Sequence, residues 1–126
     1  MNTFWNSFLD KKAMLMFQKA HRAACRRAVK KHLPFEISLD DIIHQYVSQS
    51  GRCFYSNLEM NIIKNDKKDV LHDPYKMTLD CKNSGLGYTK DNIVWCIYCV
   101  NSFKQKMEKE ELINICYNIM KHNEKN

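Results

Sequence analysis

Apolar positions along the chain follow helical spacing in some segments and strand-like spacing in others. Across residues 6–32 they recur every three or four positions with no Gly or Pro between them, which predicts a long helix that ends before Pro34. A shorter helical pattern follows over residues 38–50. Its start has Ser38 followed three residues later by Asp41, the arrangement of a capping box with Asp in place of Glu. Both segments are therefore expected to be helices, the second of them amphipathic.

Residues 77–107 carry a different pattern. The runs 77–80 and 93–98 are rich in β-forming residues, and the polar gap between them contains Gly85 and Gly87, which we expect to have positive φ. The second run passes into a short segment with helical spacing. The order predicted for this stretch is strand, loop, strand, helix, with Tyr88 and Trp95 as packing residues.

The last patterned stretch returns to helical spacing, and its apolar stripe is expected to close over the hairpin as part of the core. That stripe consists of Leu112, Ile113, Cys116, Ile119 and Met120. A chain of 126 residues forms one modest core. We therefore predict a single α+β domain over residues 1–126, made of a basic N-terminal helix (1–35), a helix and support segment (36–60), a loop (61–76), the hairpin with its helix (77–107) and a C-terminal helix (108–122).

The net charge of the chain indicates the kind of partner that it binds. Lys and Arg number 20 against 14 acidic residues, a net charge of +6, which favours a polyanion, nucleic acid before membrane. The first predicted helix has eight basic residues between positions 11 and 31 and no acid. This surface is either a solvated helix face or a contact for the DNA backbone, and we favour the second interpretation. The candidate contacts are Arg22, Arg26, Arg27, Lys30 and Lys31.

The lack of a membrane-spanning segment and of a signal-peptide pattern indicates the cellular compartment. No apolar run is long enough for a membrane span, and the N-terminal residues lack the apolar core of a signal peptide. We expect an intracellular protein, in the cytoplasm or nucleus of its host cell. Six cysteines in such a compartment are expected to be free thiols or metal ligands rather than disulfides.

The candidate chemistry lies at the end of the first strand and the start of the following helix. In a strand–loop–strand–helix unit these two points can meet, which would bring the Asp80 carboxylate beside the Asn101 amide oxygen. Both are hard oxygen donors of the kind that Mg²⁺ accepts while it keeps most of its waters. The alternatives are a turn-capping role for Asp80 and a helix N-cap role for Asn101.

The same residues resemble a known motif. LDCKNSGLGYTKDNIVW followed by Asn101-x-x-Lys104 is similar to the hairpin of HNH (ββα-metal) nucleases, in particular a phage and viral subgroup whose members read approximately LDRIDxxxGYxxxNVxW and then NxxK. Residues 51–60 resemble that group's upstream GxCxxTGxPL segment. The resemblance implies a DNA endonuclease that uses one Mg²⁺ or Mn²⁺ held by Asp80 and Asn101. It also implies that Asn92 belongs to the catalytic motif, where it ties the loop to the hairpin, and that Lys104 faces a phosphate.

One position departs from the family pattern. Where HNH proteins carry the histidine that activates water, and the closer subgroup carries Arg, this chain has Cys81, and a thiol is a poor base at neutral pH. Three readings stay open. A base comes from elsewhere, with His72 the best candidate; metal-bound hydroxide reacts slowly without a positioned base; or the protein is a catalytically weak or inactive HNH-fold nucleic-acid-binding protein that acts as a regulator or inhibitor.

A zinc site is the remaining metal hypothesis. Cys96-x-x-Cys99 is half of a tetrahedral site, and the upstream counterpart reads Cys53-x-x-Ser56, so we favour buried structural thiols over a zinc-ribbon interaction module. The expected partner is double-stranded DNA. Cutting both strands would need a dimer or two encounters, and the sequence leaves the oligomeric state open.

Overall fold

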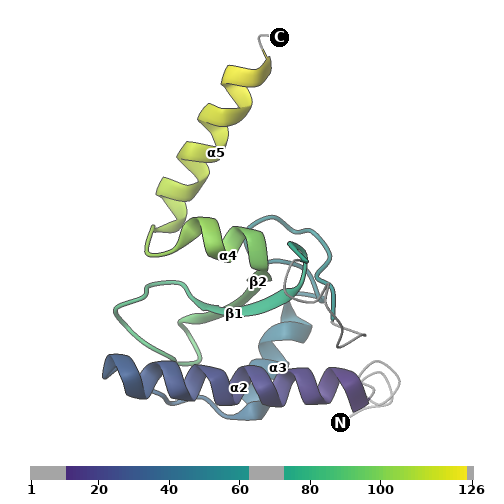
Figure 1. Cartoon of the computed structure of the whole chain (residues 1–126), viewed down its shortest axis with the longest axis vertical. Helices are drawn as coiled ribbons and strands as arrows, with labels where there is room; N and C mark the ends of the chain where they lie inside the picture. The colour runs from purple at the N-terminus through teal and green to yellow at the C-terminus, as the bar shows by residue number, and fades with distance from the viewer. Residues whose placement is uncertain (1–10, 63–72, 125–126) are drawn as a thin grey trace.

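A short β-hairpin lies between helices that cover its two faces (Figure 1). The computed structural model describes residues 11–62 and 73–124. Within these ranges four helices accompany a two-stranded antiparallel sheet, which confirms a mixed α+β fold. The elements are α2 (Lys11–Lys31), α3 (Leu39–Ser48), β1 (Met77–Cys81), β2 (Ile93–Ile97), α4 (Tyr98–Lys104) and α5 (Lys109–Glu124). None of these helices is long and apolar enough to cross a membrane.

The end of α2 and both ends of α3 lie close to the predicted positions, while the predicted start of the first helix, at residue 6, lies outside the described residues. α2 ends at Lys31, and His32 follows with φ of 57°. α3 has the predicted capping box: the Asp41 backbone N–H donates to Ser38 Oγ at 3.1 Å, and the Ser38 N–H donates to Asp41 Oδ2 at 2.8 Å. Local sequence signals are therefore sufficient to place these helices.

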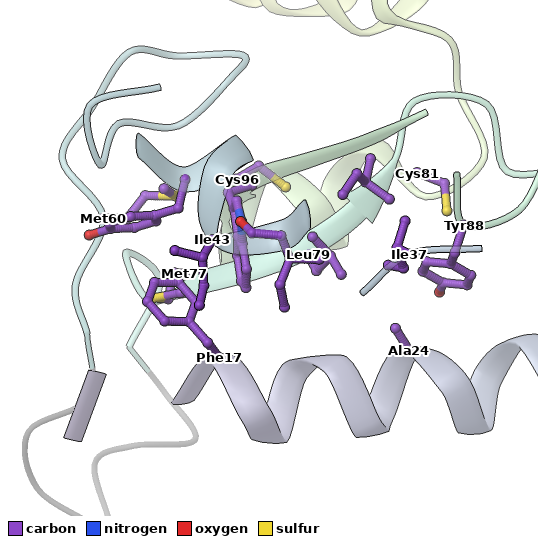
Figure 2. Close-up of a cluster of buried hydrophobic side chains, with 14 of the residues drawn as sticks. Phe17, Ala24, Ile37, Ile43, Met60, Met77, Leu79, Cys81, Tyr88 and Cys96 are labelled. Atoms are coloured by element: carbon purple, nitrogen blue, oxygen red, sulfur yellow. The ribbon is translucent and has the colours of Figure 1, made fainter. Parts of the chain in front are cut away.

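The core lies between the hairpin and the helices α2 and α3 (Figure 2). Trp95 of β2 is fully buried, and its ring packs edge-on against Phe17 of α2 at 5.6 Å and Tyr46 of α3 at 6.2 Å. Its indole Nε1 donates to the Ile42 carbonyl at 2.7 Å, so its polar atom is satisfied inside the core. Trp95 is thus a core residue, as predicted.

The two faces of β1 differ. Met77, Leu79 and Cys81 are buried on the side that faces α2 (Figure 2), while Thr78 and Asp80 are half-buried. This alternation follows from the two-residue period of a strand. Both half-buried side chains contact α4, on the other side of the sheet from α2 (Figure 1). The strand therefore separates a core face from a polar face.

The hairpin loop depends on one glycine rather than two. Gly87 has φ of 78°, and a Cβ there would lie 2.7 Å from Pro34 Cδ and 2.8 Å from the Pro34 carbonyl oxygen. Gly85 does not have positive φ, so the prediction for that residue is wrong. It lies exposed in the loop, where its backbone N–H donates to Asn83 Oδ1.

Two further predictions need correction. Tyr98, expected to end the second strand, is the first residue of α4. The apolar stripe of α5 was expected to close over the hairpin, yet Leu112 is the only residue of α5 that is buried. The rest of α5 projects away from the sheet (Figure 1). The helical pattern identified the helix correctly but could not show what its apolar face contacts.

Candidate functional site

The polar face of β1 brings a carboxylate and an ammonium group together. The Asp80 side chain is only 12% exposed, and its Oδ2 lies 3.2 Å from Nζ of Lys104, whose side chain is 1% exposed. The same ammonium lies 3.4 Å from the Cys81 carbonyl oxygen. A buried charge is stable only when it is paired and hydrogen-bonded, and Asp80 supplies the pairing here. Lys104 was expected to face a phosphate; instead it points inward at Asp80.

Tyr55 is the third member of this group. Its hydroxyl donates to Asp80 Oδ2 at 3.3 Å, and the Lys104 ammonium lies 5.6 Å from the centre of its ring. Burial, and then the charge of Asp80, raise the pKa of the Tyr55 phenol, which keeps it protonated as a donor. Sequence reasoning missed Tyr55 because its only signal was a place in the apolar part of residues 51–60.

Asn101 lies over the same face of the strand but contacts a different residue. Its Nδ2 donates to Thr78 Oγ1 at 3.1 Å, and Thr78 Oγ1 in turn donates to the Cys96 carbonyl at 2.8 Å. Because the hydroxyl proton of Thr78 is used in the second bond, its oxygen must accept from Asn101, which fixes the amide orientation. The N-cap of α4 is Ile97, so Asn101 is not a helix cap.

A divalent ion fits this donor set in part. The Asn101 side chain contacts Thr78 through its amide nitrogen, so its amide oxygen takes no part in that bond. Lys104 and Tyr55 both contact Asp80 through Oδ2, so Oδ1 takes no part in these two contacts. Two such oxygens suit Mg²⁺, which keeps several waters. The Lys104 ammonium competes, however, because it already neutralises Asp80. Across residues 11–62 and 73–124, no cluster of three or more His, Cys, Asp or Glu side chains is placed to hold a metal.

Cys81 is not placed to act as a base beside Asp80. Its side chain lies on the core face of β1, opposite Asp80, and its thiol donates to the Gly87 carbonyl at 3.3 Å. Burial, and then the charge of Asp80, raise the pKa of the Cys81 thiol to about 11. A neutral thiol on the wrong side of the strand does not activate water at Asp80. His72 lies outside the described residues.

The cysteines of the candidate zinc pair lie in different elements. Cys96 is fully buried in β2, where its sulfur lies 3.6 Å from Thr78 Oγ1, whereas Cys99 is exposed on α4. The prediction of a buried structural thiol is therefore right for Cys96 and wrong for Cys99. The reason is that the strand ends at Ile97, so the second cysteine lies on a helix surface.

Asn92 holds the hairpin loop together. Its Oδ1 accepts from the Asn83 N–H at 3.0 Å, and its Nδ2 donates to the carbonyls of Asn83 at 2.9 Å and Gly87 at 2.7 Å. The side chain is buried. These are the loop-tying bonds expected of this residue; a part for Asn92 in catalysis stays a prediction.

Most of the candidate DNA contacts of α2 are exposed, namely Arg22, Arg26, Lys30 and Lys31. Arg27 differs, because its Nε donates to the Tyr88 hydroxyl at 3.0 Å and its guanidinium lies 5.8 Å from the centre of that ring. The basic helix lies on the opposite side of the sheet from α4 (Figure 1), whose Lys104 contacts Asp80. It could therefore hold DNA beside the candidate site but not at it.

Two lysines that were not among the sequence candidates lie against the ring of Phe54, the neighbour of Tyr55. Lys82 directly follows β1, and Lys109 begins α5; their ammonium groups lie 5.5 Å and 5.4 Å from the centre of the Phe54 ring. Phe54 is the neighbour of Tyr55 and packs edge-on against it at 5.1 Å. Only the fold brings these two cations, 27 positions apart in the chain, to one aromatic ring.

Comparison of the chain with protein-family models, with curated protein sequences and with solved structures gives no match in any of the three. Function must therefore be argued from the residues themselves.

Proposed function

We propose that this protein is a metal-dependent DNA endonuclease of HNH type that hydrolyses phosphodiester bonds with one divalent ion, Mg²⁺ or Mn²⁺. The observation that carries the proposal is the meeting of strand and helix over the polar face of β1. There Asp80 is 3.2 Å from Lys104 of α4, and Asn101 of the same helix bonds to Thr78, two residues from Asp80. This arrangement, with the sequence resemblance to the HNH hairpin, supports a site for one ion and one phosphate.

Each residue has a distinct part in that reaction. The oxygens of Asp80 and Asn101 would hold the ion, which when bound polarises the phosphate and stabilises the leaving oxygen. Lys104 places a positive charge beside the same carboxylate, where it can favour a phosphate once the ion neutralises Asp80. The Tyr55 hydroxyl holds Asp80 Oδ2 in one orientation. His72 remains the proposed base, and slow attack without a positioned base is the alternative.

The DNA duplex would contact basic groups on more than one side of the hairpin. Lys82 and Lys109 lie near Tyr55 and could contact phosphates next to the scissile one. The exposed Arg22, Arg26 and Lys30 of α2 would anchor the duplex further away. Cation–phosphate contacts of this kind release counterions, so binding should weaken steeply as salt is added.

The test is cleavage of supercoiled plasmid by the purified full chain with Mg²⁺ or Mn²⁺. The proposal expects nicked or linear product that EDTA abolishes and that Asp80→Ala and Asn101→Ala each reduce by at least an order of magnitude. Asp91→Ala and Asn114→Ala, which remove the same groups from exposed positions, should cut like the parent chain. Cleavage that survives both site substitutions would rule out this metal site.

A second candidate is favoured by two specific observations. The buried Lys104 ammonium already neutralises Asp80, and the Cys81 thiol lies on the far face of the strand. Both suit a catalytically weak or inactive HNH-fold protein that binds nucleic acid as a regulator or inhibitor. Salt-sensitive DNA binding with no cleavage in any divalent metal would favour this candidate over the nuclease.

A further inference from the structure

The apolar face of α5 is the largest departure of the fold from the sequence prediction. Ile113, Tyr117, Ile119 and Met120 are each about half exposed, although their spacing along the helix is that of a buried stripe. Single exposed apolar residues are ordinary, but a contiguous apolar patch on a soluble protein marks an interaction surface. This face therefore needs a partner that the isolated chain does not supply.

The exposed stripe forms one wall of an apolar groove. The groove has a volume of about 590 Å³ and lies between α4 and α5, and Tyr55 is also among its lining residues. Its lining includes Val100 and Phe103 of α4 and Ile113, Cys116, Tyr117 and Met120 of α5. A groove of this composition is suited to an amphipathic helix, which inserts apolar side chains at helical spacing.

The charges at the two ends of α5 indicate which amphipathic helix could bind in the groove. Glu110 and Glu111 lie in its first turn, and Lys121 and His122 lie in its last turn. A second α5 in antiparallel orientation would place its basic end beside the acidic end of the first, at both ends of the pair. Lys121 also lies 3.6 Å from Glu124, but both side chains are about half exposed, and such a pair contributes little to stability.

We propose that α5 is the interface of a symmetric homodimer, in which the α5 helices of two copies pack antiparallel and each fills the groove of the other. A two-fold interface uses the same patch on both copies, so the patch must complement itself, as α5 does. A helix of 16 residues is about 24 Å long, and one face of it falls short of the ~800 Å² per partner of a standard interface. Filling the groove beside the helix supplies further area. DNA does not suit this surface, because its walls are apolar and no Lys or Arg of the described residues lines it.

The antiparallel arrangement has a geometric consequence at Cys116. This residue lies midway in sequence between Glu110 and His122, and also midway between Glu111 and Lys121. Pairing those charges across a two-fold axis brings the Cys116 residues of the two copies together at the axis. Facing residues of two packed helices, whose axes are ~8–10 Å apart, come within the ~4–7 Å between Cα atoms that a disulfide spans.

The first test is the mass of the full chain in solution, measured by light scattering during size-exclusion chromatography over a wide range of concentrations. The proposal expects a dimer that Met120→Glu weakens at least ten-fold. Asn118→Glu adds the same charge on the polar face of the same helix and should leave the dimer intact; circular dichroism verifies that both variants fold. A monomer at every concentration, or a dimer that Met120→Glu leaves unchanged, would overturn the proposal.

The second test addresses the orientation of the helices. Glu110→Lys with Glu111→Lys should weaken the dimer, and adding Lys121→Glu and His122→Glu in the same chain should restore it. Mild oxidation should join two chains through Cys116, and the covalent dimer should disappear in Cys116→Ser but persist in Cys99→Ser. Failure of the charge reversal to restore the dimer, or cross-linking through Cys99 alone, would contradict the antiparallel arrangement. None of these results depends on nuclease activity.

Discussion

At the candidate site, Asp80 and Lys104 neutralise each other inside the protein, 3.2 Å apart. Removing two charges from water has a large desolvation cost, which their attraction and the added contacts with Tyr55 and the Cys81 carbonyl offset. Each member therefore depends on the other. The Lys104 ammonium therefore already occupies one side of the Asp80 carboxylate. A divalent ion that binds there must either share Asp80 with Lys104 or displace Lys104.

The pairing predicts a large effect of a single substitution. Lys104→Met should lower the free energy of unfolding by about 3–5 kcal/mol, because Asp80 is left charged and half-buried without its cation. The double variant Asp80→Asn with Lys104→Met should recover much of that loss. Urea unfolding followed by circular dichroism measures both. Equal losses for the single and double variants would mean that Asp80 and Lys104 are not energetically coupled.

The burial of Cys81 predicts that its thiol reacts more slowly than an exposed cysteine and that the stability of the fold depends on pH. The pKa of its thiol, about 11 in the fold against 9.0 ordinarily, keeps it neutral and unreactive near pH 8, whereas the exposed Cys99 should alkylate readily. Since the folded pKa is the higher one, the stabilisation from the neutral thiol is complete below pH 9 and is lost as pH rises toward 11. Peptide mapping after brief iodoacetamide treatment measures the first effect, and urea unfolding at pH 8 and pH 10.5 measures the second. Rapid labelling of Cys81 in the folded protein would contradict its buried position.

At the scale of elements, the hairpin loop is held by two features that the sequence indicated. Asn92 bonds to the backbone at three points across the loop, and Gly87 allows that backbone to lie against Pro34. The loop therefore connects the hairpin to the segment between α2 and α3. Its conformation fixes the end of β1, where Asp80 lies.

This arrangement predicts different outcomes for two glycine substitutions in one loop. Gly87→Ala should destabilise the fold by roughly 1–3 kcal/mol, because the new methyl group would overlap Pro34 at a positive φ. Gly85→Ala is the matched control and should have little effect, because the nearest atom to its added Cβ is 3.5 Å away. Thermal unfolding of both variants tests the claim, and equal melting temperatures would contradict it.

The sequence was sufficient where local rules determine the outcome and insufficient where a tertiary contact does. The capping box at Ser38 and the strands on either side of the loop follow from neighbouring residues, and they were predicted. The burial of Lys104 depends on Asp80 and Tyr55, which lie 24 and 49 positions earlier. Met120 is exposed because the described elements do not cover that face of α5. Helical spacing alone cannot show whether an apolar face is covered.

For the whole molecule, α2 and α4 lie on opposite sides of the sheet (Figure 1), so the proposed DNA anchor on α2 is separate from Lys104 of α4 and the Asp80 that it contacts. The exposed cations Arg22 and Arg26 lie one helical turn apart on a helix with no acid in its first turn. Their mutual repulsion weakens α2 slightly, and a phosphate between them would offset it. The same separation allows the anchor to be altered without touching the site.

DNA affinity should therefore respond to salt through α2. Arg22→Gln with Arg26→Gln should reduce the slope of log affinity against log salt concentration by roughly 2, since each lost phosphate contact removes about 0.9. Lys90→Gln, whose exposed ammonium already pairs with Asp41 at 3.6 Å, is the control and should leave the slope unchanged. Fluorescence anisotropy on a labelled duplex provides the measurement. An unchanged slope in the double variant would exclude α2 as the anchor.

The most direct test of the proposed site is the binding of Mn²⁺ to the purified protein, measured by electron paramagnetic resonance of the free ion. We expect one bound ion per chain. Binding should be lost in Asp80→Asn and weakened in Asn101→Ala, and it should be tighter in Lys104→Met because the competing ammonium is gone. Binding that is absent from the parent chain and from Lys104→Met, or that persists in Asp80→Asn, would contradict a metal site at Asp80 and Asn101.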